Sequence, residues 1–225
     1  MASTATLGLG KGRIEALTDG IFATVMTVLV LSLSIPTILG GTNPAITSYV
    51  LGLGSTAISY VLSFLTLGVF WVRHHNIFHF ISRVNNTFLW LNMFFLLTVG
   101  FVPFSTELIG RFPNAEISTI IYGSNLIASG LCLQAIWLYS MNRKLLIADG
   151  LDERVMSRIN KRLTGGPVLY AGAILASLIF PDGSELALGI YIAALVYYIF
   201  ASSRWGWRLS RGTVRTTTHT PPSTQ

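Results

Sequence analysis

Six long apolar runs, separated by short polar segments, constrain this chain more than any other feature. Each run is close to the roughly 20 residues that a helix needs to cross a bilayer. They span about Ile14–Ile35, Ser48–Val72, Thr87–Ser105, Ile117–Met141, Leu163–Phe180 and Glu185–Ser202. Only 11% of the 225 residues are charged, whereas a soluble domain carries about a quarter. The sequence therefore predicts an all-α integral membrane protein with six transmembrane helices.

The segments outside these runs leave no room for a separate soluble domain. We expect residues 1–212 to form one six-helix unit and the polar residues 213–225 to be a disordered cytoplasmic tail. Charged residues between 149 and 162 recur at helical spacing, and we interpret this segment as a solvated helix at the membrane surface. The single cysteine, Cys132, excludes an intramolecular disulfide and a cysteine-based metal cluster.

The distribution of the cations explains the formal net charge of +6 without a nucleic-acid partner. With the N-terminus inside, fourteen of the fifteen Lys and Arg residues fall on cytoplasmic segments, and only Arg111 falls outside. The fourteen are Lys11, Arg13, Arg73, Arg83, Arg143, Lys144, Arg154, Arg158, Lys161, Arg162, Arg204, Arg208, Arg211 and Arg215. This is the positive-inside pattern of six spans, so we expect both termini in the cytoplasm.

The first apolar run carries an unusual acidic residue. Asp19 lies about one and a half turns inside the run, where an unpaired carboxylate costs roughly 2.5–3.5 kcal/mol. Its expected partners are cations at the same level, namely Arg13, Arg73, His74 and His75. Such a cluster either ties the first two helices together or serves as a proton relay or ion site, and the residues alone leave both open.

A stripe of four residues follows on the same run. Thr24, Thr27, Val28 and Leu31 recur at i, i+3, i+4 and i+7 and so share one helix face. On a packed or lipid-facing helix the threonine hydroxyls would bond their own backbone. If several copies of the helix surround an axis, the same stripe would form hydroxyl rings that coordinate a cation and apolar rings that close the path by dewetting.

Two motifs resemble the signature of the transmembrane protein 175 family. That family comprises potassium channels of endosomes and lysosomes with prokaryotic relatives, and its hallmark is an arginine, three residues, then Phe-Ser-Asp. Here Arg13 and Asp19 match, while Leu17 and Thr18 replace the phenylalanine and the serine. The run 71–75, Trp-Val-Arg-His-His, resembles the family's Trp/His motif. The likeness extends over the whole chain, although the motifs occupy only about 25 residues.

The resemblance implies a homotetramer whose central pore is lined by the first helix of each subunit, without a carbonyl filter. Carried over by position, the family's constriction falls on Thr24, where this chain has a hydroxyl in place of Ile or Leu. The threonine ring linked to selectivity, which would bind permeating potassium transiently, falls on Thr27, and apolar rungs fall on Val28 and Leu31. The polar network of the family falls on Arg13, Asp19, Trp71 and His75, with His74 as a neighbour.

We therefore predict a potassium-selective channel for passive conduction, with no cofactor, in a plasma membrane. The alternative is a secondary transporter that couples to protons through Asp19 and His75. Such folds show internal repeats and broken helices at the membrane centre, which the sequence does not suggest. An intramembrane enzyme using His74 and His75 is disfavoured because adjacent residues point to different helix faces and no Glu or Cys lies at ligand spacing.

Overall fold

The computed structural model describes residues 10–34, 42–143 and 153–212 of the chain. This part contains one 3₁₀ helix and eight α-helices. In chain order they are α1 (Lys11–Val28), η1 (Leu29–Leu33), α2 (Asn43–Gly52), α3 (Gly54–His79), α4 (Asn86–Gly100), α5 (Val102–Arg111), α6 (Glu116–Asn142), α7 (Glu153–Ile179) and α8 (Gly183–Gly212). The predicted tail, residues 213–225, lies outside the described residues.

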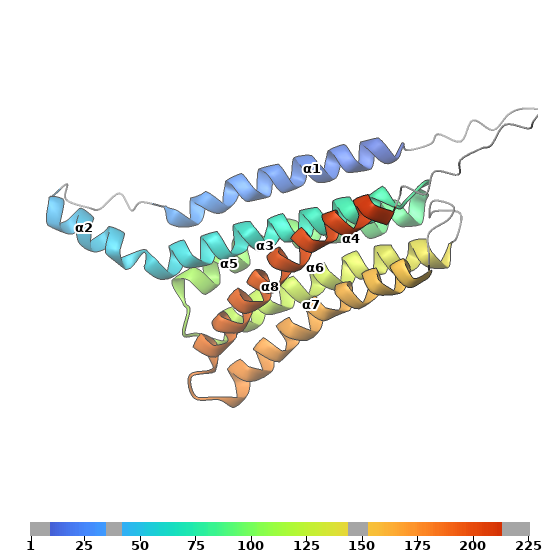
Figure 1. The fold of residues 1–225 in the computed structure, drawn as a ribbon. Helices are drawn as coiled ribbons and strands as arrows, with labels where there is room; N and C mark the ends of the chain where they lie inside the picture. The colour runs from blue at the N-terminus through green and yellow to red at the C-terminus, as the bar shows by residue number, and fades with distance from the viewer. Residues whose placement is uncertain (1–9, 35–41, 144–152, 213–225) are drawn as a thin grey trace, which may run out of the picture.

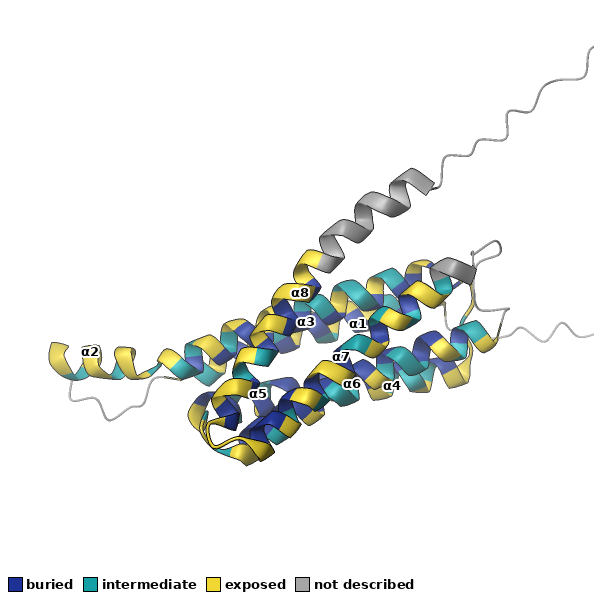
Figure 2. Ribbon diagram, turned by 60° about the horizontal axis from the view of Figure 1, so that its bottom comes forward, coloured by how far each residue is buried: buried dark blue, intermediate teal, exposed yellow. Residues whose placement is uncertain are grey.

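Six helical segments are long and apolar enough to cross a membrane, which confirms the predicted class. They are Lys11–Leu33, Gly54–His79, Asn86–Arg111, Glu116–Asn142, Met156–Ile179 and Gly183–Phe200. The helices run side by side in alternating directions, and α2 extends beyond the bundle at one end (Figure 1). No residue of α2 is buried, and Figure 2 shows it exposed along its length.

One end of the bundle collects the segments that carry most cations. The start of α1, the connection from α3 to α4, the end of α6, the start of α7 and the end of α8 all lie at the same end (Figure 1). An even number of crossings requires this arrangement. The geometry therefore agrees with the charge asymmetry from which we predicted that both termini lie on one side.

The second and third spans end later than their apolar runs suggested. The predicted second span stopped at Val72, but α3 continues through the polar residues 73–76 to His79, because helices α4, α7 and α8 supply partners for them. The predicted third span stopped at Ser105, but the helical path resumes after a break at Phe101 and reaches Arg111. Pro103 is tolerated because it lies in the first turn of α5, where its missing N–H has no partner to lose.

The fifth span also begins earlier than predicted. Helix α7 starts at Glu153, so the charged segment continues the transmembrane helix and does not form a separate surface helix. Pro167 lies inside α7 and packs against α6, where a Cβ atom on Gly130 would be 2.9 Å from the proline Cγ. A glycine at this position therefore permits the close contact between the two helices.

Polar side chains join the helices inside the bundle. The Thr106 hydroxyl donates to Ser63 Oγ at 2.7 Å, and Ser63 Oγ lies 3.1 Å from the Tyr122 hydroxyl, which links α5, α3 and α6. These three side chains are fully or almost fully buried. Lipid provides no hydrophobic drive for helix association, so interhelical hydrogen bonds of this kind contribute to it at about 0.6 kcal/mol each.

Candidate functional site: the exposed face of the first helix and its polar anchor

Helix α1 has one buried face and one exposed face. Its buried residues are Ile14, Thr18, Phe22, Val25 and, in η1, Leu29, and they follow the 3–4 residue spacing of one helix face. This face packs on α3, α4 and α5, and the Phe22 ring lies 5.9 Å from the ring of Phe95 in α4. The opposite face is exposed over the part of the chain that the structure describes.

The four residues predicted to line a pore all lie on the exposed side. Thr24 and Thr27 are exposed, and Val28 and Leu31 are 40% and 68% exposed. The chain tightens to a 3₁₀ helix at Leu29, and side chains at i and i+3 eclipse in such a helix. Leu31 therefore lies nearly in line with Val28, which continues the stripe towards the end of the span.

The threonine hydroxyls of this stripe donate to their own helix. Thr24 Oγ1 donates to the Gly20 carbonyl at 2.8 Å, and Thr27 Oγ1 lies 2.8 Å from the Thr24 carbonyl and 3.1 Å from the Ala23 carbonyl. Both a packed helix and a pore helix are compatible with these bonds. Because each proton is directed back to the helix, the oxygen lone pairs are left facing outward, where they can accept a hydrogen bond or ligate a cation.

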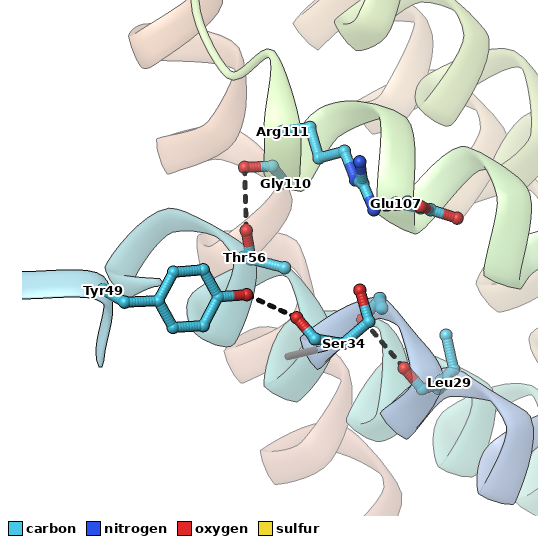
Figure 3. Close-up of polar contacts among 8 residues, drawn as sticks. Leu29, Ser34, Tyr49, Thr56, Glu107, Gly110 and Arg111 are labelled. Atoms are coloured by element: carbon cyan, nitrogen blue, oxygen red, sulfur yellow. Dashed lines mark hydrogen bonds and ion pairs between the residues drawn. The ribbon is translucent and has the colours of Figure 1, made fainter. Parts of the chain in front are cut away.

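The far end of the first span is held by a second set of bonds (Figure 3). The Tyr49 hydroxyl of α2 donates to the Ser34 carbonyl, and Ser32 Oγ donates to the Leu29 carbonyl at 2.8 Å. Nearby, Thr56 Oγ1 donates to the Gly110 carbonyl at 3.3 Å, which joins α3 to α5. The Tyr49 bond ties the residue after η1 to α2, and the Ser32 bond closes the last turn of η1, while the residues of the stripe stay exposed.

At the cation-rich end, Asp19 is anchored by a neutral donor. The indole N–H of Trp71 donates to Asp19 Oδ1 at 2.8 Å, and the Trp71 ring stacks on His75 with 5.7 Å between ring centroids. Within the described residues Asp19 forms no ion pair, so the expectation of a cationic partner is wrong for this subunit. The structure brings Asp19, Trp71 and His75 together.

His74 belongs to a different and buried contact. Its Nε2 lies 2.9 Å from Asn92 Oδ1, and Asn92 Nδ2 donates to Thr18 Oγ1 at 3.2 Å. All three residues are 3% exposed or less, and the His74 ring stacks between Phe78 and Phe95. This chain of bonds connects α3, α4 and α1. Sequence reasoning missed the part played by Asn92, although a lone amide within an apolar run is a signal for such a bond.

The two arginines of the predicted cluster are directed elsewhere. Arg73 Nη2 donates to the Arg162 carbonyl at 2.9 Å, and its guanidinium lies 4.0 Å from the ring centre of Tyr198. Arg13 is exposed, and no salt bridge joins it to another described residue. Neither residue therefore joins the Asp19 contact within one subunit.

The described residues contain no group of three or more His, Cys, Asp or Glu side chains that could hold a metal ion. The arrangement instead defines a polytopic helical membrane protein with an uncovered polar and apolar stripe on its first span. Comparison with known proteins identifies its family. The family model described as endosomal/lysosomal potassium channel TMEM175 matches residues 13–103.

Relatives extend the match over most of the chain. A potassium channel of Chamaesiphon minutus is 30% identical over 195 residues, covering 85% of this chain and 95% of the relative. The crystal structure of a Chamaesiphon minutus homologue of the lysosomal potassium-selective channel TMEM175 superposes with a TM-score of 0.75 at 28% identity. The match covers 85% of this chain and 97% of that one. A zebrafish endosomal/lysosomal proton channel is 25% identical over 86% of this chain and 38% of its own length. The chain belongs to the TMEM175 family.

Proposed function

We propose that the chain forms a potassium-selective channel in which four copies of α1 surround a central pore. The observation that carries the proposal is the exposed stripe of Thr24, Thr27, Val28 and Leu31, which lies opposite the buried face of a membrane-spanning helix. A single copy cannot enclose a path. A closed cyclic ring places the same stripe of each subunit on the axis.

The chemistry of the stripe divides the pore into two parts. Rings of Thr24 and Thr27 hydroxyl oxygens replace part of the hydration shell of a permeating potassium ion, because their lone pairs face away from the helix that holds their protons. Rings of Val28 and Leu31 present no polar atom and close the path by dewetting. Binding at Thr27 is transient, as conduction requires the ion to leave.

The polar contacts at the other end of α1 position this stripe. The Trp71–Asp19 bond and the His74–Asn92–Thr18 chain hold two consecutive residues of α1, about 100° apart around its axis, against α3 and α4. Together they set the rotation of α1 about its own axis. A rotation of one residue, 100°, would turn the threonines away from the axis.

The named relatives support a channel over the alternatives. The bacterial relatives are named potassium channels, and the zebrafish relative is named a proton channel. A transporter coupled through Asp19 and His75 has no comparable support, and nothing in the described part of the chain suggests an enzyme. The cation asymmetry supports a multi-pass membrane protein with both termini in the cytoplasm.

The proposal is tested by reversal potentials of purified protein in liposomes, with potassium on one side, sodium on the other and equal pH. We expect the potential to move towards the potassium equilibrium value. Thr27→Val keeps the shape of the side chain but removes the oxygen that would ligate the ion. An interaction of such an oxygen with a charged group contributes about 1.5–3 kcal/mol. The permeability ratio of potassium to sodium should therefore fall roughly tenfold or more.

Thr47→Val is the matched control, because Thr47 is also exposed and also donates to its own helix, at 2.9 Å from the Asn43 carbonyl. This variant should keep the selectivity of the unmodified protein. An absence of current, or equal selectivity in the two variants, would refute the proposed pore. A current driven only by a pH gradient would show instead that protons are the permeant ion.

A further inference from the structure

A cavity of about 260 Å³ opens between α3, α7 and α8 at the cation-rich end of the bundle. It lies away from the proposed pore, since α1 packs on α3, α4 and α5, whereas α7 packs on α6 and α8. The mechanism above makes no use of it. Its lining combines two kinds of surface that a single ligand would have to match.

The first kind of surface is basic. Four cations line the cavity, Arg73 from α3 and Arg158, Lys161 and Arg162 from α7, and no acidic residue is among its described lining. Arg73 is held in place by its bond to the Arg162 carbonyl and by the ring of Tyr198. Arg158 and Lys161 are exposed and free to close over a ligand. Such a cluster recognises a phosphate group.

A buried donor adds to this surface. Tyr198 is only 5% exposed, and its hydroxyl makes no hydrogen bond of ordinary geometry within the described residues, although Arg73 lies beside it. Buried polar groups without a partner are rare and costly. The same tyrosine lines the cavity, so a ligand oxygen there would supply the missing partner.

The second kind of surface is apolar and continues towards the lipid-facing side. Val69 and Val72 of α3 and Leu163 of α7 line the cavity, and Tyr197 at its edge is 59% exposed. The cavity lies where the charged start of α7, which runs through Arg162, meets the apolar part that begins at Leu163. This is the level of phospholipid headgroups, and basic pockets between transmembrane helices bind such headgroups.

We propose that this cavity binds an anionic phospholipid, with its phosphate between Arg73, Arg158 and Lys161 and an acyl chain along Val69 and Leu163. The charge of the lining selects an anionic headgroup, and the apolar wall selects a lipid over a soluble phosphate. The inference rests on the six-span membrane fold and not on the proposed conduction.

Native mass spectrometry of the full-length protein, purified and equilibrated in mixed phosphatidylglycerol and phosphatidylcholine, tests the site. We expect the unmodified protein to retain phosphatidylglycerol. An Arg158→Gln/Lys161→Gln variant should retain about tenfold less of this lipid. Arg83→Gln/Arg143→Gln is the control, because it removes the same charge from exposed residues at the same end that do not line the cavity.

Tyr198→Phe gives a second readout. It should weaken retention of phosphatidylglycerol without lowering the melting temperature of the lipid-free protein, because the hydroxyl makes no hydrogen bond of ordinary geometry within the described residues. Equal loss in the control variant would show a diffuse surface charge and overturn the site, as would unchanged retention in all variants. Displacement of the lipid by millimolar inorganic phosphate would show a site for soluble phosphates and overturn the assignment to lipid.

Discussion

Asn92 joins three helices through two hydrogen bonds. Replacing it should lower the free energy of unfolding more than replacing any other single polar residue near the first helix. Asn92→Leu removes both bonds and leaves His74 Nε2 and Thr18 Oγ1 buried without partners. A buried polar group left unpaired costs about 1–3 kcal/mol, so the expected loss in unfolding free energy is about 2–4 kcal/mol. Thr18→Val removes only the longer bond, at 3.2 Å, and should cost about 1 kcal/mol.

The two changes should not add. In the double variant the Asn92–Thr18 bond is lost only once, so its cost should fall short of the sum by about 0.6 kcal/mol, the average for interhelical bonds in membranes. The assay is detergent-induced unfolding in bicelles, followed by tryptophan fluorescence. Asn142→Leu is the control, because Asn142 is exposed at the end of α6, and should change stability by less than about 0.5 kcal/mol. A loss in Asn92→Leu no greater than in this control would refute the reasoning.

Two further changes test the packing and the pore. A Cβ atom on Gly123 would clash with the Tyr191 hydroxyl and lie 2.9 Å from Ile174 Cγ1, so Gly123→Ala should destabilise the protein by about 1–3 kcal/mol. Gly172→Ala, with nothing within 4 Å of its Cβ atom, should leave the melting temperature in detergent almost unchanged. Equal melting temperatures for the two variants would contradict this packing. Thr24→Ile replaces a hydroxyl ring of the proposed pore with a larger apolar ring and should lower single-channel conductance in planar bilayers, and an unchanged or larger conductance would remove Thr24 from the constriction.

The six spans were predictable because length and apolarity decide whether a helix crosses a bilayer, but their ends depend on partners that the local sequence does not reveal. The polar residues 73–76 looked like the end of a span, yet His74 is accommodated inside α3 by Asn92 and Arg73 by the Arg162 carbonyl. Those partners are 18 and 89 residues away in the chain. No local pattern predicts such distant contacts.

In the candidate site, too, local spacing was predictable from the sequence, whereas the partners of the side chains were not. Helical spacing placed Thr24, Thr27, Val28 and Leu31 on one face, and their exposure in the subunit agrees with that grouping. Reasoning from charge gave Asp19 a cationic partner, whereas the indole of Trp71 satisfies it. The roles of these residues in conduction stay predictions.

The central claim, that the exposed face of α1 lines the path of the ion, is tested most directly by cysteine accessibility. Cys132→Ala first removes the native thiol, the chain's only cysteine. Leu31→Cys in that background should give a potassium current that a membrane-impermeant, cationic thiol reagent blocks. Val61→Cys on α3, which is also exposed in the subunit, should give a current that the reagent leaves unchanged. A full current through Leu31→Cys after complete modification, verified by mass, would contradict the account.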